Sequence, residues 1–190
     1  MAKNFNELFS KLRENGMKKV SVAVAQDEPV LEAVREAKEL GIAEAVLVGN
    51  EEKIKEIAKK IGMNLADFEI INEPNDKKAA LLAVELASTG KTDMVMKGLV
   101  DTATFLRSVL NKEVGLRTGQ LMSHVSVFEI PGMDRLLFLT DAAFNTYPEL
   151  KDKASMINNS VKVAHACGVQ VPKVAVIGAV EVVRSEERRV

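Results

Sequence analysis

The order of apolar and polar positions along the chain predicts alternating strands and helices. Short runs of consecutive apolar residues alternate with longer segments in which apolar residues recur every three or four positions, and these spacings are typical of buried strands and amphipathic helices. The predicted helices are 4–15, 28–40, 51–61, 76–88 and 148–167, with a further helix that starts after Gly98. The predicted strands are 20–25, 44–49, 68–71, 94–96, 123–130, 135–140 and 173–180.

This order predicts an α/β fold with three layers. Strand and helix alternate up to residue 110, which favours a parallel sheet wound through right-handed crossovers. The strands 123–130 and 135–140 are joined only by the turn 131–134, so we expect an antiparallel hairpin at one edge of the mostly parallel sheet.

The last predicted strand also suggests how the domains are divided. Residues 1–165 are predicted to form a first α/β domain, and residues 166–190 to begin a second domain that is truncated. The apolar strand 173–180 is followed only by a charged tail at 184–190, which we expect to be disordered. An apolar strand without a covering element also predicts self-association, and therefore a homo-oligomer.

The stretch 94–110, MVMKGLVDTATFLRSVL, carries the main candidate site. Lys97 follows an apolar run, where the carboxyl end of a buried strand places it in the crevice in which open α/β sheets bind ligands. Gly98 lets the backbone turn there, and Arg107 offers a planar fork suited to phosphate. The residues that can cap the next helix are Asp101, Thr102 and Thr104.

Two interpretations of this stretch remain open. One is a phosphate site, and the other is a surface lysine, an ordinary helix cap and a solvated arginine. The spacing matches neither the Walker pattern nor G-x-G-x-x-G.

Polar residues elsewhere add weaker candidates. Asp141 and Asn145 follow the second hairpin strand, where a strand end is expected to face the cleft. Ser123, Ser126 and Arg117 are polar groups near that cleft, with plain solvent exposure an equal alternative. The two histidines, His124 and His165, and the single Cys167 lack metal-ligand spacing, so structural roles are expected for them and no metal site.

Composition excludes several classes of partner. With 26 basic and 27 acidic side chains the net charge is −1, which provides no general field for nucleic acid or an anionic membrane. The chain has no tryptophan and one tyrosine, which disfavours stacking on single-stranded nucleic acid. The single cysteine and the lack of a signal peptide or a long apolar run predict a cytoplasmic protein that does not span a membrane.

Four separated segments resemble one known family. They are MKGLVDTATFLRSVL, SHVSVFEIP, LTDAAFNTYPELKDKASMINNSV and KVAVIGAVEVV, and together they resemble the first half of the butyryl branch of the phosphate acetyl/butyryl transferase family. The acetyl branch has a serine where Lys97 stands. The resemblance implies a fold like that of isocitrate and isopropylmalate dehydrogenases. It also implies transfer of a butyryl group between coenzyme A and inorganic phosphate, with coenzyme A as a substrate and no bound cofactor.

The resemblance also implies which residues bind substrate. Arg107 would bind phosphate or acyl phosphate, and the residues lining the same cleft would be Lys97, Gly98, Thr102, Ser123, Asp141 and Asn145. The family's catalytic serine–arginine pair and aspartate lie beyond Val190, so no catalytic residue is assigned and this chain is expected to be inactive alone. The alternatives are a phosphate acetyltransferase and a truncated, non-catalytic phosphate-binding α/β module.

Overall fold

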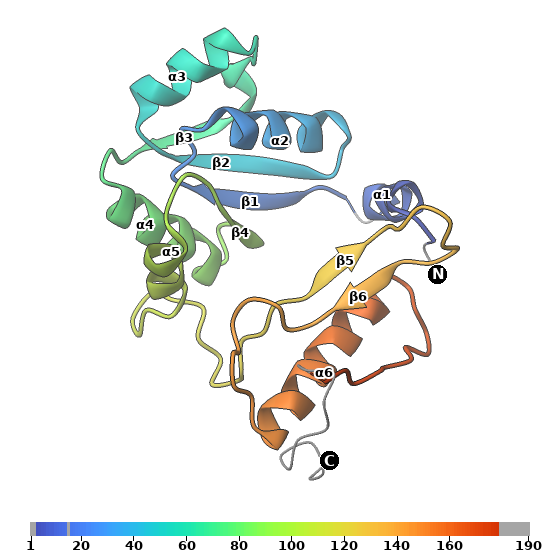
Figure 1. Cartoon of the computed structure of the whole chain (residues 1–190). Coiled ribbons are helices and arrows are strands. Elements are labelled where there is room, and N and C mark those ends of the chain that lie inside the picture. Colours follow the sequence, from blue (N-terminus) through green and yellow to red (C-terminus); the bar gives the residue numbers. More distant parts are fainter. Residues whose placement is uncertain (1–2, 15, 179–190) are drawn as a thin grey trace. The chain divides into compact units, whose positions relative to one another are not determined.

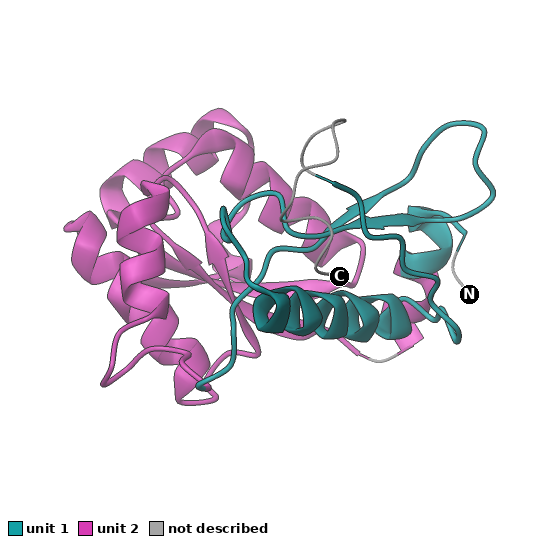
Figure 2. Cartoon of the chain, turned by 60° about the horizontal axis from the view of Figure 1, so that its bottom comes forward, with its two compact units in different colours: residues 1–8, 119–190 teal, residues 9–118 magenta. Residues whose placement is uncertain are grey.

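The chain folds into two compact units (Figure 2). A computed structural model describes residues 3–14 and 16–178. Unit 1 takes residues 1–8 and 119–190, and unit 2 takes residues 9–118. The helix α1 (Phe5–Glu14) spans the boundary between the two units.

Unit 2 is built on a four-stranded parallel sheet (Figure 1). Its strands are β1 (Lys18–Ala23), β2 (Ala43–Gly49), β3 (Glu69–Asn72) and β4 (Met94–Lys97), in the order β3-β2-β1-β4. Val22 of β1 lies opposite Leu47 of β2 and Met96 of β4. The parallel sheet predicted from the alternating pattern is therefore confirmed.

Helices cover both faces of this sheet. They are α2 (Glu28–Glu39), α3 (Glu51–Lys60), α4 (Asp76–Ser88) and α5 (Thr102–Val109), with a 3-10 turn at Leu65–Asp67 before β3. Leu31 of α2 and Ile54 of α3 pack on one face, and Ala80 of α4 packs on the other. Helices on both faces of the sheet give unit 2 its three layers (Figure 1).

The first strand ends two residues earlier than the apolar run predicts. Val24 is fully buried but has a φ of 61°, the left-handed region that a β-branched residue rarely adopts. This conformation turns the chain out of the sheet before α2. The apolar run predicts correctly that residues 24–25 are buried, but it does not predict that the chain bends at Val24.

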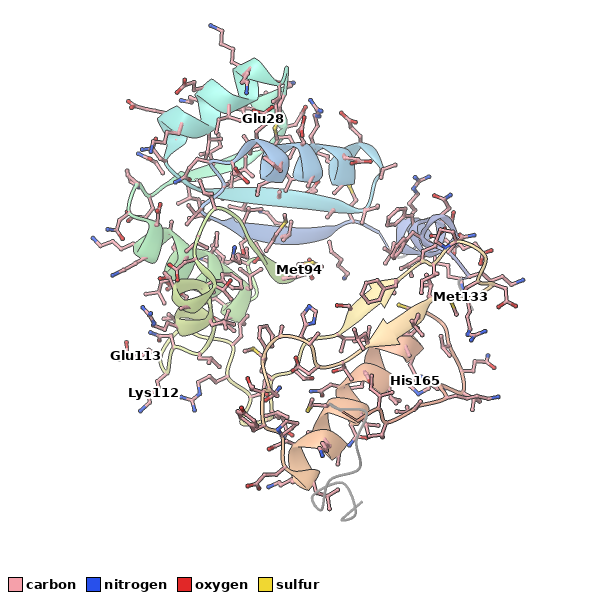
Figure 3. The ribbon with its side chains drawn as sticks, viewed as in Figure 1. Glu28, Met94, Lys112, Glu113, Met133 and His165 are labelled. Atoms are coloured by element: carbon pink, nitrogen blue, oxygen red, sulfur yellow. The ribbon has the colours of Figure 1, made fainter. Side chains whose placement is uncertain are left out.

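The place of β4 also differs from expectation. The run 94–96 predicts a strand covered on both faces, whereas β4 is the edge strand of the described sheet and Met94 is 47% exposed (Figure 3). An apolar groove of about 310 Å³ runs beside it, lined in part by Val20, Val34 and Met96. An apolar run does not by itself distinguish a central strand from an edge strand.

Unit 1 contains the predicted hairpin, but as a separate sheet. β5 (Ser126–Phe128) pairs antiparallel with β6 (Leu137–Leu139), and α6 (Leu150–Ala166) packs against β6. The expectation that this hairpin extends the edge of the parallel sheet is wrong. The hairpin satisfies its ladder hydrogen bonds internally, so its sequence does not determine which sheet it joins.

The end of the chain corrects one further expectation. Residues 173–178 form no strand, and Val174, Val176 and Ile177 are 50%, 65% and 76% exposed. A buried strand needs a partner for its backbone groups, and no described strand pairs with this segment. Residues 179–180 and the tail 184–190 lie outside the described residues, and the domain division at 165/166 stays a prediction. No helix in the described part of the chain has the length and apolarity to cross a membrane.

Candidate functional site

The loop from Lys97 to Asp101 is fastened to the end of β1. The Gly98 N–H donates to the Ala23 carbonyl at 2.8 Å, and the Leu99 N–H donates to the Val24 carbonyl at 2.8 Å. The left-handed Val24 turns its carbonyl toward this loop, and such a conformation costs about 1 to 2 kcal/mol. The loop is therefore held by a strained turn, which is an arrangement that clusters at functional sites.

A glycine is required at position 98 because there is no room for a side chain. A Cβ at this position would lie 2.4 Å from the Val24 carbonyl oxygen and 2.7 Å from that of Ala23. Both atoms belong to backbone, so no side-chain movement can relieve the contact. The sequence predicts a glycine for the turn, but the close approach of β1 is the stronger reason for it.

Asp101 caps the helix that follows. Its carboxylate accepts from the Thr104 N–H at 2.8 Å. The Thr104 side chain and then its N–H lower the pKa of Asp101. The predicted helix cap is confirmed. Because this carboxylate already occupies the N-terminus of α5, attraction for another anion has to come from cationic side chains.

The predicted phosphate ligands in unit 2 lie exposed around this loop. The Lys97 ammonium lies 3.3 Å from the Gly98 carbonyl oxygen, and Thr102 and Arg107 are exposed on α5. Both cations are therefore accessible to a ligand. A larger hollow of about 410 Å³ lies elsewhere in unit 2, between Asn50 and Asn72, but Glu51 and Glu52 line it and disfavour an anion.

Asp141 in unit 1 is the centre of a hydrogen-bond cluster. Its carboxylate accepts from the backbone N–H groups of Ala143, Phe144 and His124 at 2.8, 2.9 and 3.1 Å, and from the Asn145 amide at 2.6 Å. Burial raises the pKa of Asp141, but these donors outweigh it and lower the pKa to about 2. That Asp141 and Asn145 face a cleft stays a prediction; the structure shows that their side chains bond to each other and to the backbone.

The hydrogen-bond cluster around Asp141 predicts that the free energy of unfolding falls in acid. Because the folded pKa lies below the ordinary value of about 3.9, the stabilisation is present above pH 4 and is lost as the pH falls toward 2. Asp141→Asn should therefore lower the free energy of unfolding at pH 7 by about 1 to 2 kcal/mol, after allowance for solvent screening. It should also flatten the acid limb of the stability profile.

Urea unfolding followed by circular dichroism between pH 2 and 7 measures this effect. Asp134→Asn is the matched control, because the Asp134 side chain is 88% exposed. If the two variants had equal stability profiles, the hydrogen-bond cluster around Asp141 would contribute nothing to the free energy of unfolding.

Ser123 has a partner that the sequence does not reveal. The Asn159 amide on α6 donates to the Ser123 hydroxyl oxygen at 2.9 Å and to the Leu121 carbonyl at 3.1 Å. Sequence periodicity places Ala154, Ile157, Val161 and Ala164 on the buried side of this helix, yet Ala154 is exposed and Met156 is buried. The sequence therefore offers no signal for the contact between Asn159 and Ser123.

The surroundings of His165 and Cys167 suit structural roles, whereas the buried Nδ1 atom of His124 has no hydrogen-bond partner among the described residues. The His124 ring lies edge-on to Phe144, with 5.8 Å between ring centroids, and His165 on α6 (Figure 3) lies 2.9 Å from the Val169 carbonyl. Burial raises the pKa of the Cys167 thiol, which disfavours the nucleophilic thiolate. Among the described residues, no group of three or more His, Cys, Asp or Glu side chains could hold a metal ion.

Comparison with known proteins agrees with this arrangement. A family model described as "Phosphate acetyl/butaryl transferase" matches residues 4–80 and 74–190. The chain is 72% identical to the phosphate butyryltransferase of Clostridium acetobutylicum over 96% of the chain, and 68% identical to that of Clostridium beijerinckii over 97%. It is 40% identical to the phosphate acetyltransferase of Thermotoga maritima over 94%.

Solved structures share the fold. A phosphotransacetylase from Streptococcus pyogenes matches 87% of this chain and 60% of its own, with a TM-score of 0.72 and 20% identity. A branched-chain phosphotransacylase from Enterococcus faecalis matches 78% of this chain and 51% of its own, with a TM-score of 0.66 and 23% identity.

The match covers only part of the length of these relatives. The chain spans 61% of the length of each of the two clostridial proteins. The family model nevertheless matches nearly all of this chain, including the segment from Lys97 to Arg107, the hairpin and α6. The chain therefore belongs to the phosphate acetyl/butaryl transferase family.

Proposed function

We propose that this chain acts in the transfer of a butyryl group between coenzyme A and inorganic phosphate. The observation that carries the proposal is the 72% identity to a phosphate butyryltransferase over 96% of the chain. In this reaction a phosphate oxygen attacks the thioester carbonyl carbon, and the carbon–sulfur bond breaks. Butyryl phosphate forms, and the sulfur leaves as coenzyme A thiolate and takes up a proton.

The exposed cations of unit 2 suit the phosphate. Lys97 supplies a point charge, Arg107 supplies a planar pair of donors, and the Thr102 hydroxyl can add a further hydrogen bond. The loop that carries Lys97 is fastened to β1 by backbone hydrogen bonds, so little ordering is needed when phosphate binds. The role of Gly98 in this proposal is to allow that fastening.

Several finer points stay predictions. They are a cytoplasmic location, a homo-oligomeric state, kinship with the isocitrate and isopropylmalate dehydrogenase fold, and binding of substrate by Ser123, Asp141 and Asn145. We also place the general base outside this chain, in the C-terminal part of the relatives that it does not cover. A phosphate-binding module without catalytic activity is the second candidate, because the chain spans only 61% of its relatives.

An assay of coenzyme A release tests the proposed reaction. It uses the extended chain, defined as this chain followed by the C-terminal part of the Clostridium acetobutylicum relative that it does not cover. We expect phosphate-dependent release of coenzyme A, with kcat/KM for butyryl-CoA about 10 to 200 times that for acetyl-CoA, because added methylenes bury apolar area. A preference for acetyl-CoA would favour the acetyl branch, and no phosphate dependence would contradict the proposal.

Arg107 should affect phosphate more than the acyl donor. In the extended chain, Arg107→Ala should raise the KM for phosphate about 10- to 100-fold, because a hydrogen bond to a charged group contributes about 1.5 to 3 kcal/mol. Lys112→Ala is the control, since this variant removes the same charge. Lys112 is exposed on the loop after α5 (Figure 3). Equal effects of the two variants would indicate a general charge effect rather than binding by Arg107.

A further inference from the structure

Leu99 is an exposed apolar side chain in the loop between β4 and α5. This loop contains two apolar side chains, of which Val100 is buried and Leu99 is 55% exposed. A leucine in water does not contribute the burial energy that stabilises a fold. Leu99 gains that energy only when another molecule or segment covers it.

The backbone fixes the place of Leu99. Its N–H donates to the Val24 carbonyl at 2.8 Å. The Val100 N–H donates to the Gly98 carbonyl at 2.9 Å, which closes a three-residue turn with Leu99 at its apex. Val24 accepts its bond at a φ of 61°, and strained residues of this kind cluster at functional sites. Because the turn is already ordered, little backbone order is lost when a ligand covers Leu99.

Leu99 stands beside a cation that suits the phosphate. Lys97 precedes it by two positions, so their Cα atoms lie within about 7 Å of each other. Lys97 and Arg107 are exposed, like Leu99, and all three belong to unit 2. The loop therefore presents an apolar side chain next to an ammonium group within one compact unit.

This pairing matches the chemistry of an acyl phosphate. In butyryl phosphate the carbonyl carbon is joined to phosphorus through a single oxygen atom. A phosphoryl group held by Lys97 therefore keeps its apolar chain within reach of a neighbouring side chain. Butyryl is longer than acetyl by two methylene groups, and each methylene adds apolar area that a contact can bury. An apolar residue in this loop can thus distinguish the two acyl groups.

We propose that Leu99 is a specificity-determining residue whose side chain contacts the methylene groups of the butyryl chain. The inference rests on the proposed acyl transfer to phosphate. Leu99 makes and breaks no bond, so it alters which acyl group is preferred and leaves the binding of phosphate unchanged. The alternative is that a segment of the protein covers Leu99 for stability alone, which predicts equal effects on both acyl donors.

Leu99→Ala in the extended chain tests this role. The variant should lower kcat/KM for butyryl-CoA about tenfold, since an apolar pocket discriminates one methylene by about 10- to 200-fold. It should change kcat/KM for acetyl-CoA and the KM for phosphate less than about twofold, because neither depends on the added methylenes. Leu99→Met keeps the volume and the apolar character, so it should restore kcat/KM for butyryl-CoA to within about threefold of the unsubstituted chain.

Leu110→Ala is the matched control. Leu110 is 46% exposed and follows the eight residues of α5, which separate it from the loop by about 12 Å. This variant removes the same apolar group from the same unit. It should change the ratio of kcat/KM for butyryl-CoA to that for acetyl-CoA less than about twofold. If Leu99→Ala did not fold, Leu99→Gln, which is of similar length but polar at its end, provides the same comparison.

The ratio of the two kcat/KM values decides the inference. An unchanged ratio in Leu99→Ala, equal losses with both acyl donors, or an unsubstituted extended chain that prefers acetyl-CoA would overturn it. The first two results leave the proposed reaction intact, and equal losses would assign Leu99 a structural role. An extended chain without phosphate-dependent turnover would instead overturn the proposed function and this inference with it.

Discussion

The 190-residue chain should release coenzyme A from butyryl-CoA about 10² to 10⁴ times more slowly than the extended chain, which is the contribution expected from a general base. Lys97 and Arg107 can bind phosphate in the ground state and the transition state alike, and uniform binding does not raise turnover. Acceleration requires groups that act as the thiolate forms, and we place those groups beyond this chain. Loss of orientation between coenzyme A and phosphate would slow the reaction further.

Purified protein from a host that lacks its own phosphotransacylase is needed for this comparison. Arg107→Ala in the extended chain distinguishes turnover by the protein from contaminating activity, because only the former should depend on Arg107. Turnover by the 190-residue chain within tenfold of the extended chain would show that this chain itself contains the catalytic groups.

Gly98→Ala should unfold unit 2 more easily and also impair phosphate binding. The new Cβ would lie 2.4 Å from the Val24 carbonyl oxygen, so the loop has to move away from β1 and lose its two hydrogen bonds. Overpacking of this kind costs about 3 kcal/mol. A displacement of the loop by about 1 Å should reduce turnover of the extended chain about 100-fold, since Lys97 and Arg107 move with it.

Gly90→Ala is the matched control for this variant. Gly90 has a φ of 74° but open space around the position of a Cβ, so alanine there should cost about 1 kcal/mol through backbone strain alone. Urea unfolding of the two variants, with turnover of the extended forms, measures both quantities. If Gly98→Ala were no more harmful than Gly90→Ala, the contact with β1 would not hold the loop.

Much of the site's local structure could be predicted from sequence because it depends on near neighbours. The Asp101 cap contacts Thr104, three positions away. The Asp141 and Asn145 side chains pair across four positions. Such contacts are set by the geometry of one turn of chain, so residue type and spacing are sufficient to propose them.

The sequence by itself determined the alternation of strands and helices, the parallel sheet of unit 2, the hairpin of unit 1 and the family. Only the tertiary structure decided that β4 is an edge strand of the described sheet, that the hairpin forms its own sheet, and that Gly98 is needed because Val24 approaches it. It also decided that the Asn159 amide donates a hydrogen bond to the Ser123 hydroxyl oxygen. The physical reason is sequence separation. Strand and helix periods arise from neighbouring residues, whereas Ser123 and Asn159 are 36 positions apart and Val24 and Gly98 are 74 apart. No local period encodes which distant partner a residue meets.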